Sequence, residues 1–345
     1  MYQHRELIQV ERHYLIDNAK IALMFFVVFG HCLELTHNNP MLHSLYLLIY
    51  SFHIPMFVLI SGMLAKADIS SEDLFKQISS LLIPLLVFEV LYEVLEITRF
   101  GRLSHYSLNL QPYWLLWFLW SLFLWKLLLS ITSCFRFPVI FSLLIAVAAG
   151  YSTQIGYFLG LSRTLTFFPF FVLGYTLKPV FFQHLQKYHW LFFAAIILLA
   201  AALLNYFNDI DARWFYGSLS YSALGVEQWY AGFIRLFIYG FSFLVGIAVI
   251  ALLPNKQLKI SAYGERTLYI YMWHGFFIIL IKAIGLVDAV GILGSWSTLA
   301  VLLLLSMLIT IVLASKQLSP ITEKALFVPV RKILLEDKYL PPPLG

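Results

Sequence analysis

The feature that most constrains this chain is a series of apolar stretches of about twenty residues, separated by short connectors that are polar or contain Pro and Gly. A helix of about 20 residues crosses the roughly 30 Å of hydrocarbon in a bilayer. The predicted spans lie at residues 18–36, 42–65, 77–98, 112–132, 137–157, 162–177, 187–207, 228–253, 266–285 and 292–315. The sequence therefore predicts an all-α, polytopic membrane protein with about ten transmembrane helices.

The composition excludes a soluble protein. Hydrophobic residues make up 61% of the 345 residues and charged residues only 12%, whereas about a quarter of the residues in soluble domains are charged. A soluble core of this length could not bury so much apolar surface. The lipid bilayer is therefore an expected partner, and the net charge of +5 does not imply nucleic acid.

The basic residues predict the orientation. If the N-terminus is cytoplasmic, 17 of the 23 Lys and Arg residues lie in cytoplasmic segments, five lie outside and Arg235 lies within a span. This asymmetry follows the positive-inside rule and requires an even number of spans. We expect a cytoplasmic segment at residues 1–16, a transmembrane domain at 17–315 and a cytoplasmic tail at 316–345. A tail helix through residues 331–338 is expected on the inner leaflet.

The first predicted span has the densest set of ionisable side chains, namely Asp17, Lys20, His31 and Glu34. Such groups are costly inside a membrane and are functional candidates. Lys20 and His31 share a helix face about 16 Å apart along the axis, and Glu34 lies close enough to hydrogen-bond the imidazole. A His beside a carboxylate can act as a general base towards a hydroxyl. The alternative is a packing pair, with Lys20 reaching the inner membrane surface.

Polar residues in other spans are weaker candidates. His53 lies mid-span near Pro55, and Ser61 begins a small-residue pair that permits close helix approach; a kinked packing helix is the alternative. Trp117 belongs to an aromatic cluster that is typical of a membrane interface. Tyr271 and His274 form a polar stripe with Thr267, and simple packing is again the alternative for His274.

Two arginines in or near spans raise the question of an anionic partner. Arg163 begins the sixth predicted span and Arg235 lies inside the eighth. Arginine stays charged and binds phosphate or carboxylate through a planar fork. The partner is either a ligand or one of three glutamates in the third span, Glu89, Glu93 and Glu96. No metal is expected, because neither the cysteines nor His31, His53 and His274 have the spacing of metal ligands.

Five short segments, taken in order, resemble the membrane acyltransferase-3 family. The Lys20–His31 spacing resembles the family's Arg/Lys-x10-His signature. The four further segments are Phe52-His53-Ile54-Pro55 leading to Ser61-Gly62, Trp117-Phe118-Leu119, Phe168-Pro169-Phe170-Phe171 leading to Gly174-Tyr175, and Thr267-Leu268 leading to His274. The most similar branch contains the fucose 4-O-acetylase-like and exopolysaccharide O-acetyltransferases.

The resemblance implies transfer of an acyl group from acyl-CoA, with acetyl-CoA as co-substrate, to a hydroxyl of a cell-surface glycan, glycolipid or sugar. It also implies a multi-pass protein of the plasma membrane (the inner membrane in bacteria), with a cytoplasmic donor and an acceptor on the other side. His31 would be the general base, oriented by Glu34. Donor contacts would come from Lys20, Lys76, Arg163 and Arg235. The residues expected to contact substrate are Asp17, His53, Ser61, Trp117, Tyr271 and His274, several of which could offer hydrogen bonds to an oxyanion.

This chain departs from the family pattern at Lys20, where many members carry Arg, so a forked contact to phosphate becomes a point charge. Two other classes of function stay open at this stage. A transporter or flippase would use the same buried charges as a substrate or proton pathway, although the two related halves that are common in transporters are not visible. A structural subunit of a polysaccharide-export assembly would have no activity of its own. The oligomeric state is not predicted.

Overall fold

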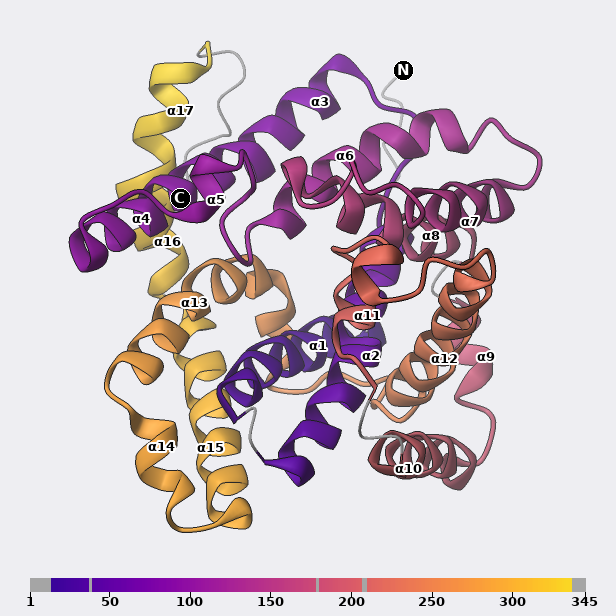
Figure 1. Ribbon diagram of the computed structural model, residues 1–345. Helices are drawn as coiled ribbons and strands as arrows, with labels where there is room; N and C mark the ends of the chain where they lie inside the picture. Colours follow the sequence, from indigo (N-terminus) through magenta and orange to yellow (C-terminus); the bar gives the residue numbers. More distant parts are fainter. Residues whose placement is uncertain (1–13, 37–38, 178–179, 207–209, 337–345) are drawn as a thin grey trace.

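The computed structural model describes residues 14–36, 39–177, 180–206 and 210–336, and all regular structure in these ranges is helical (Figure 1). Six of its helices are long and apolar enough to cross a membrane, and they span Tyr14–Thr36, Pro40–Met63, Ser71–Phe100, Phe158–Leu177, Ala231–Ala251 and Ser295–Leu313. The prediction of an all-α polytopic membrane protein is therefore confirmed.

Every predicted span contains a helix, although the helices differ in length. They are α1 (Tyr14–Leu33) with η1 (Glu34–Thr36), α2 (Pro40–Met63), α3 (Ser71–Gln77) continuing through η2 (Ile78–Leu82) into α4 (Ile83–Phe100), α6 (Trp117–Thr132), α7 (Pro138–Ala149), η3 (Phe158–Gly160) with α8 (Leu161–Leu177), α10 (Trp190–Tyr206), α12 (Ala231–Ala251), α13 (Thr267–Ala283) and α15 (Ser295–Leu313). Four of them, α6, α7, α10 and α13, have between 12 and 17 residues. The count of ten crossings thus stays a prediction.

Short helices connect these elements or cap the bundle. They are α5 (His105–Leu108), α9 (Val180–Leu185), α11 (Arg213–Tyr216), η4 (Ser222–Leu224), η5 (Ser261–Arg266), α14 (Leu286–Gly291), α16 (Leu318–Thr322), η6 (Glu323–Phe327) and α17 (Val328–Leu334).

Local sequence explains where the helices begin and end. Pro40 occupies the first turn of α2, where its missing N–H leaves no helical bond unmade, and the Asn39 side chain accepts from the Leu42 N–H at 3.2 Å. Ser70 and Asp73 cap α3 reciprocally. Gly101 ends α4 with a left-handed φ of 68°, a conformation that glycine adopts without steric penalty.

The core lies around α2, which contacts α1, α8, α10 and α12. In Figure 1, α1 and α2 occupy the centre, α8, α10 and α12 lie on one side, and α13, α14 and α15 lie on the other. Both α2 and α8 contain an internal proline, Pro55 and Pro169 respectively. The arrangement places the polar faces of α1, α2 and α8 towards one another inside an apolar bundle.

The tail differs from its prediction. The last described helix ends at Leu334, short of the predicted end at residue 338, and Arg331 is buried. Arg331 pairs with Glu323 and donates to the Ser79 carbonyl at 3.0 and 3.2 Å. A buried arginine needs such partners, so this segment packs on the bundle. The expected cytoplasmic segment at 1–16 and the tail end largely fall at 1–13 and 337–345, outside the described residues.

The two ends of the bundle differ in the segments that form them. At the Lys20 end of α1, the Asn18 side chain donates to the carbonyls of Pro254 and Lys256 at 2.8 and 3.0 Å. At the other end, where α1 terminates beyond His31, the connectors 105–116, 156–160 and 216–218 gather around a hollow. The candidate site therefore lies at the end of the bundle opposite Lys20.

Candidate active site

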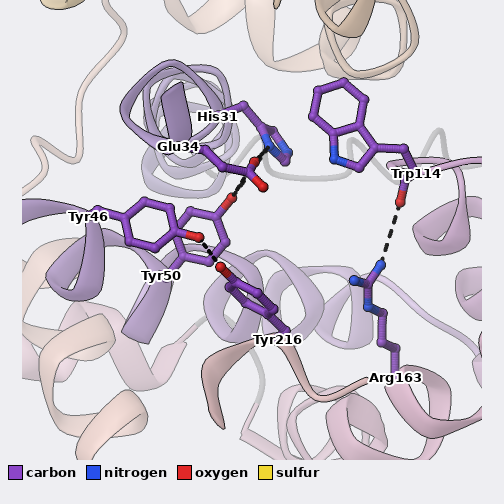
Figure 2. A network of polar contacts seen from close by, with 7 residues as sticks. All are labelled: His31, Glu34, Tyr46, Tyr50, Trp114, Arg163 and Tyr216. Carbon is purple, nitrogen blue, oxygen red and sulfur yellow. Dashed lines mark hydrogen bonds and ion pairs between the residues drawn. The ribbon is translucent and has the colours of Figure 1, made fainter. Parts of the chain in front are cut away.

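The centre of the site is a hydrogen-bonded pair formed by His31 and Glu34 (Figure 2). The Nδ1 atom of His31, in the last turn of α1, lies 3.1 Å from Oε2 of Glu34 in η1. Residues three apart on a helix are neighbours on one face, which brings the two side chains together. A carboxylate can only accept, so in the neutral ring Nδ1 carries the hydrogen and Nε2 keeps a lone pair. That is the state in which an imidazole can take a proton.

A cluster of tyrosines supports the carboxylate from α2 and α11. The Tyr50 hydroxyl lies 3.4 Å from both Glu34 Oε2 and His31 Nδ1, and its ring stacks against Tyr46 at 4.1 Å. Tyr46 in turn hydrogen-bonds Tyr216 (Figure 2). The sequence analysis missed these residues. Tyr46, Tyr50 and His53 recur at the i, i+4, i+7 spacing of one helix face, which was the available signal for two of the tyrosines.

Trp114 covers His31 from the segment that precedes α6. Its ring centre lies 4.9 Å from that of His31, and its backbone adopts a left-handed φ of 27°. The segment is held in place by α4, because the Tyr113 N–H donates to Glu89 at 2.8 Å and its hydroxyl donates to Glu96 at 2.9 Å. The left-handed backbone conformation of Trp114 is uncommon for a non-glycine residue, and such a conformation persists where surrounding contacts enforce it.

Arg163 lies across the cavity from the His31–Glu34 pair. Its Nη1 donates to the Trp114 carbonyl at 3.5 Å (Figure 2). Its guanidinium lies over the Trp117 ring at 5.1 Å. In the described part of the chain no carboxylate lies within 4 Å of it. The glutamates considered as partners are engaged elsewhere: Glu89 and Glu96 accept from Tyr113, while Glu93 accepts from Ser104 and Ser107.

Two neighbouring cavities share part of their walls at this group of residues. The inner cavity, of about 80 Å³, is lined by His31, His53 and Tyr271 among others, and the outer vestibule measures about 400 Å³. Both are lined by Glu34, Trp114, Trp117, Arg163 and Tyr216. A ligand in the vestibule would therefore contact Glu34 and Trp114, which are both neighbours of the His31 ring.

His53 and His274 are held in one tautomer by the backbone. His53 Nδ1 lies 2.7 Å from the Ile49 carbonyl, and His274 Nδ1 lies 2.6 Å from the Tyr271 carbonyl. Since a carbonyl only accepts, each neutral ring has its hydrogen on Nδ1 and offers Nε2 as an acceptor. His274 Nε2 is buried with no partner among the described residues, and its ring lies 5.4 Å from that of His31. The Tyr271 hydroxyl donates to the Leu115 carbonyl.

The remaining predicted site residues lie outside both cavities. Lys20 pairs with Asp17 at 3.5 Å near the opposite end of α1, and Lys76 is exposed and pairs with Glu72 at 2.7 Å. The Ser61 hydroxyl donates to the Phe57 carbonyl at 2.8 Å.

Arg235 is buried away from the site. It donates to the Trp214 carbonyl at 2.7 Å and lies over the Trp214 ring at 5.2 Å. Among the described residues, no group of three or more His, Cys, Asp or Glu side chains is arranged to hold a metal ion.

Comparison with known proteins identifies the family. The sequence model of the acyltransferase-3 family, described as an acyltransferase domain, matches residues 13–315. The chain belongs to this family. Membership makes it a membrane acyltransferase, and it confirms the resemblance found in the sequence motifs.

One relative of this acyltransferase-3 chain is Nodulation protein NolL of Sinorhizobium fredii (strain NBRC 101917 / NGR234). It is 30% identical over 133 residues, which cover 35% of this chain and 36% of NolL. The match thus spans about a third of the relative's length. No solved structure matches the chain.

Proposed function

We propose that this acyltransferase is an O-acyltransferase that moves an acyl group, with acetyl-CoA as donor, onto a hydroxyl of a cell-surface glycan or glycolipid. The observation that carries the proposal is the His31–Glu34 pair, which lines a cavity that shares five wall residues with the vestibule. The donor would enter from the cytoplasmic face of the plasma membrane, which we place at the Lys20 end, and the acceptor from the vestibule.

His31 would activate the acceptor hydroxyl. Nε2 takes the hydroxyl proton as the acceptor oxygen attacks the thioester carbonyl carbon, and Glu34 stabilises the resulting imidazolium. When the tetrahedral intermediate collapses, the carbon–sulfur bond breaks and the thiolate receives the proton back from His31. The products are the ester and free CoA, and the imidazole ends neutral, ready for another turnover.

The length of α1 matches the donor. Lys20 and His31 are separated by about 16 Å along the helix axis, which allows a pantetheine arm to reach from a phosphate contact at Lys20 to a thioester at His31. We propose Lys20 as the main phosphate contact and Lys76 as an auxiliary one at the same face. Arg235 is left out of this assignment because its guanidinium is buried against Trp214.

The lining of the vestibule supports a sugar as acceptor. Aromatic rings are supplied by Tyr106, Trp114, Trp117, Tyr157 and Tyr216, and polar side chains include those of Gln111 and Ser218. Ring faces pack against the C–H faces of sugars, while amide and hydroxyl groups bind their hydroxyls. We propose that His53, Trp117 and Tyr271 line the acyl and acceptor positions, and that His274 fixes the back of the pocket.

The experiment uses the full chain in lipid nanodiscs with acetyl-CoA labelled in the acetyl group. A radiolabel is preferred to a thiol reagent because Cys134 is exposed. Wild-type protein should bind acetyl-CoA saturably, and cells that express it should carry base-labile label in their glycan fraction, since esters are cleaved by mild base and amides are not.

His31→Ala should bind acetyl-CoA with unchanged affinity while the base-labile label is lost. Retained labelling would remove His31 from the mechanism. No binding by folded wild-type protein would refute transfer from CoA and favour a flippase or a structural subunit.

A further inference from the structure

We propose that Arg163 binds the oxyanion that forms on the thioester carbonyl during acyl transfer. The inference rests on the proposed O-acyltransferase function and assigns one of its residues a role.

Arg163 lies at the place in the cavity wall where we expect the reacting atoms to be. It is the third residue of α8 and follows Gly160, which turns the chain with a φ of 65°. Its side chain lines both the inner cavity that contains His31 and the outer vestibule. The first turn of a 17-residue helix adds a partial positive charge at the same place. Among the described residues, Arg163 is the one Lys or Arg that lines either cavity, and it shares the wall of the inner cavity with His31.

Arg163 makes no ion pair with a carboxylate among the described residues. Its one hydrogen bond there is the 3.5 Å contact with the Trp114 carbonyl, and its Nε atom is buried without a partner. The Trp117 and Tyr157 rings, at 5.1 and 6.0 Å from the guanidinium carbon, hold the group by cation–π contact. A partly buried guanidinium without an ion pair is stabilised by an anion that arrives with the substrate.

The position of Arg163 identifies which anion this is. Lys20 and His31 are about 16 Å apart along α1, so a donor with its phosphates at Lys20 places its thioester, and not its phosphates, beside Arg163. The charge that develops there is the one on the carbonyl oxygen. Hydrogen-bond donors preorganised around that oxygen are a large source of rate enhancement in acyl transfer.

The hydrogen atoms of the neighbouring His and Tyr side chains are already used, so Arg163 is the group that can donate a hydrogen bond to the oxyanion. The neutral rings of His53, which lines the inner cavity, and of His274, which lies 5.4 Å from the His31 ring, have their hydrogens committed to backbone carbonyls. The Tyr271 hydroxyl donates to the Leu115 carbonyl. The forked guanidinium of Arg163 has several N–H groups left to donate, so one can be given to the oxyanion while the Trp114 contact is kept.

The step conserves charge and atoms. As the acceptor oxygen bonds to the carbonyl carbon, the carbonyl π pair moves to oxygen and the hydroxyl proton moves to His31. The oxyanion then lies between the Arg163 guanidinium and the newly formed His31 imidazolium. When this electron pair forms the C=O double bond again, the C–S bond breaks and the thiolate takes the proton from His31.

The test compares two ketone analogues of acetyl-CoA in which a methylene replaces the thioester sulfur, one a methyl ketone and the other a trifluoromethyl ketone. The methyl ketone resembles the ground state, whereas the trifluoromethyl ketone hydrates readily and ionises to a tetrahedral anion. Transition-state analogues bind roughly 10²-fold or more tightly than substrates. We expect the wild-type protein in nanodiscs to prefer the trifluoromethyl ketone by about that factor.

Arg163→Gln should bind the methyl ketone as the wild type does and lose nearly all of the roughly 100-fold preference, because removing one oxyanion donor costs about that factor or more. Arg163→Lys, which keeps the charge and loses the fork, should retain part of it. Arg213→Gln is the matched control, because Arg213 is exposed and pairs with Asp211 outside the cavities.

Each other outcome overturns the proposal. Equal weakening of both ketones in Arg163→Gln would make Arg163 a donor-binding residue, and an unchanged preference would exclude contact with the oxyanion. A wild type that binds both ketones equally would show that no oxyanion site exists. If folded wild-type protein binds neither ketone nor CoA, the proposed function itself fails, and the two failures are thus distinguishable.

Discussion

Gly62 of α2 and Gly174 of α8 lie against each other's helices in a reciprocal contact. A Cβ added to Gly62 would overlap the Phe171 carbonyl oxygen, and one added to Gly174 would overlap the Leu59 carbonyl oxygen. Small residues at such positions allow membrane helices to approach closely. Because α2 carries Tyr50 and His53 while α8 carries Arg163, this contact sets the distance across the reaction cavity.

Gly62→Ala and Gly174→Ala should each destabilise the protein. The added methyl meets a backbone carbonyl, which cannot rotate away, so we expect a loss of about 1–3 kcal/mol or more, as in overpacked cores. Thermal unfolding in detergent measures the effect. Gly240→Ala is the control, since no atom lies within 4 Å of its added Cβ and alanine favours the helix. Equal midpoints for all three variants would contradict the close-contact interpretation.

Glu34→Gln should lower the rate of transfer with little change in donor affinity. The amide oxygen can still accept from His31 Nδ1, so the tautomer survives, but the negative charge that stabilises the imidazolium is lost. We expect kcat to fall by about 10- to 100-fold, less than the loss of the base itself, which is worth about 10²–10⁴. Turnover measured with saturating acetyl-CoA tests this. A wild-type rate would mean that Glu34 has only a structural role.

Tyr50→Phe should have a smaller effect. The Tyr50 hydroxyl lies 3.4 Å from both Glu34 and His31, a long contact, and the ring remains in place when the hydroxyl is removed. Because this long contact has a charged acceptor, we expect it to contribute about 1.5 kcal/mol, the lower limit for hydrogen bonds to charged groups, which corresponds to a reduction of about 10-fold in kcat. Tyr46→Phe, which breaks the bond to Tyr216, provides the comparison. A complete loss of activity in a folded Tyr50→Phe protein would assign the hydroxyl a direct chemical role.

Lys20→Ala should weaken CoA binding more than Lys76→Ala. Lys20 lies partly buried on the His31 face of α1, where its charge is less screened, whereas Lys76 is exposed and paired with Glu72. Surface charges are screened by salt and contribute little. Titration of both variants with labelled CoA at two ionic strengths measures the difference. Lys20→Arg should preserve binding, and unchanged affinity in Lys20→Ala would end its assignment to the donor.

The parts of the site that could be predicted from sequence are those fixed by helix geometry. The i, i+3 spacing of His31 and Glu34 is a local relationship, and the structure shows the hydrogen bond that it implies. The eleven-residue separation of Lys20 and His31 is local too, because α1 is one uninterrupted helix from Tyr14 to Leu33.

The residues that were missed come from connectors. Trp114 reaches His31 through a left-handed turn, and Tyr216 comes from the short helix α11, far from either in sequence. Hydrophobic periodicity contains no information about how such segments fold back. The arginines show the same limit, because the local sequence could not indicate that Arg235 faces Trp214 while Arg163 faces the cavity.

Five side chains form part of the wall of both the inner cavity and the vestibule, namely Glu34, Trp114, Trp117, Arg163 and Tyr216. In the proposed reaction, an acceptor bound against these side chains would also close the inner cavity on the side of the vestibule. Water that would otherwise hydrolyse the thioester is displaced by the molecule to be modified, so waste of the donor is suppressed when an acceptor is present. Many enzymes close a protein loop over the substrate for this purpose; here the incoming sugar itself would serve as the lid.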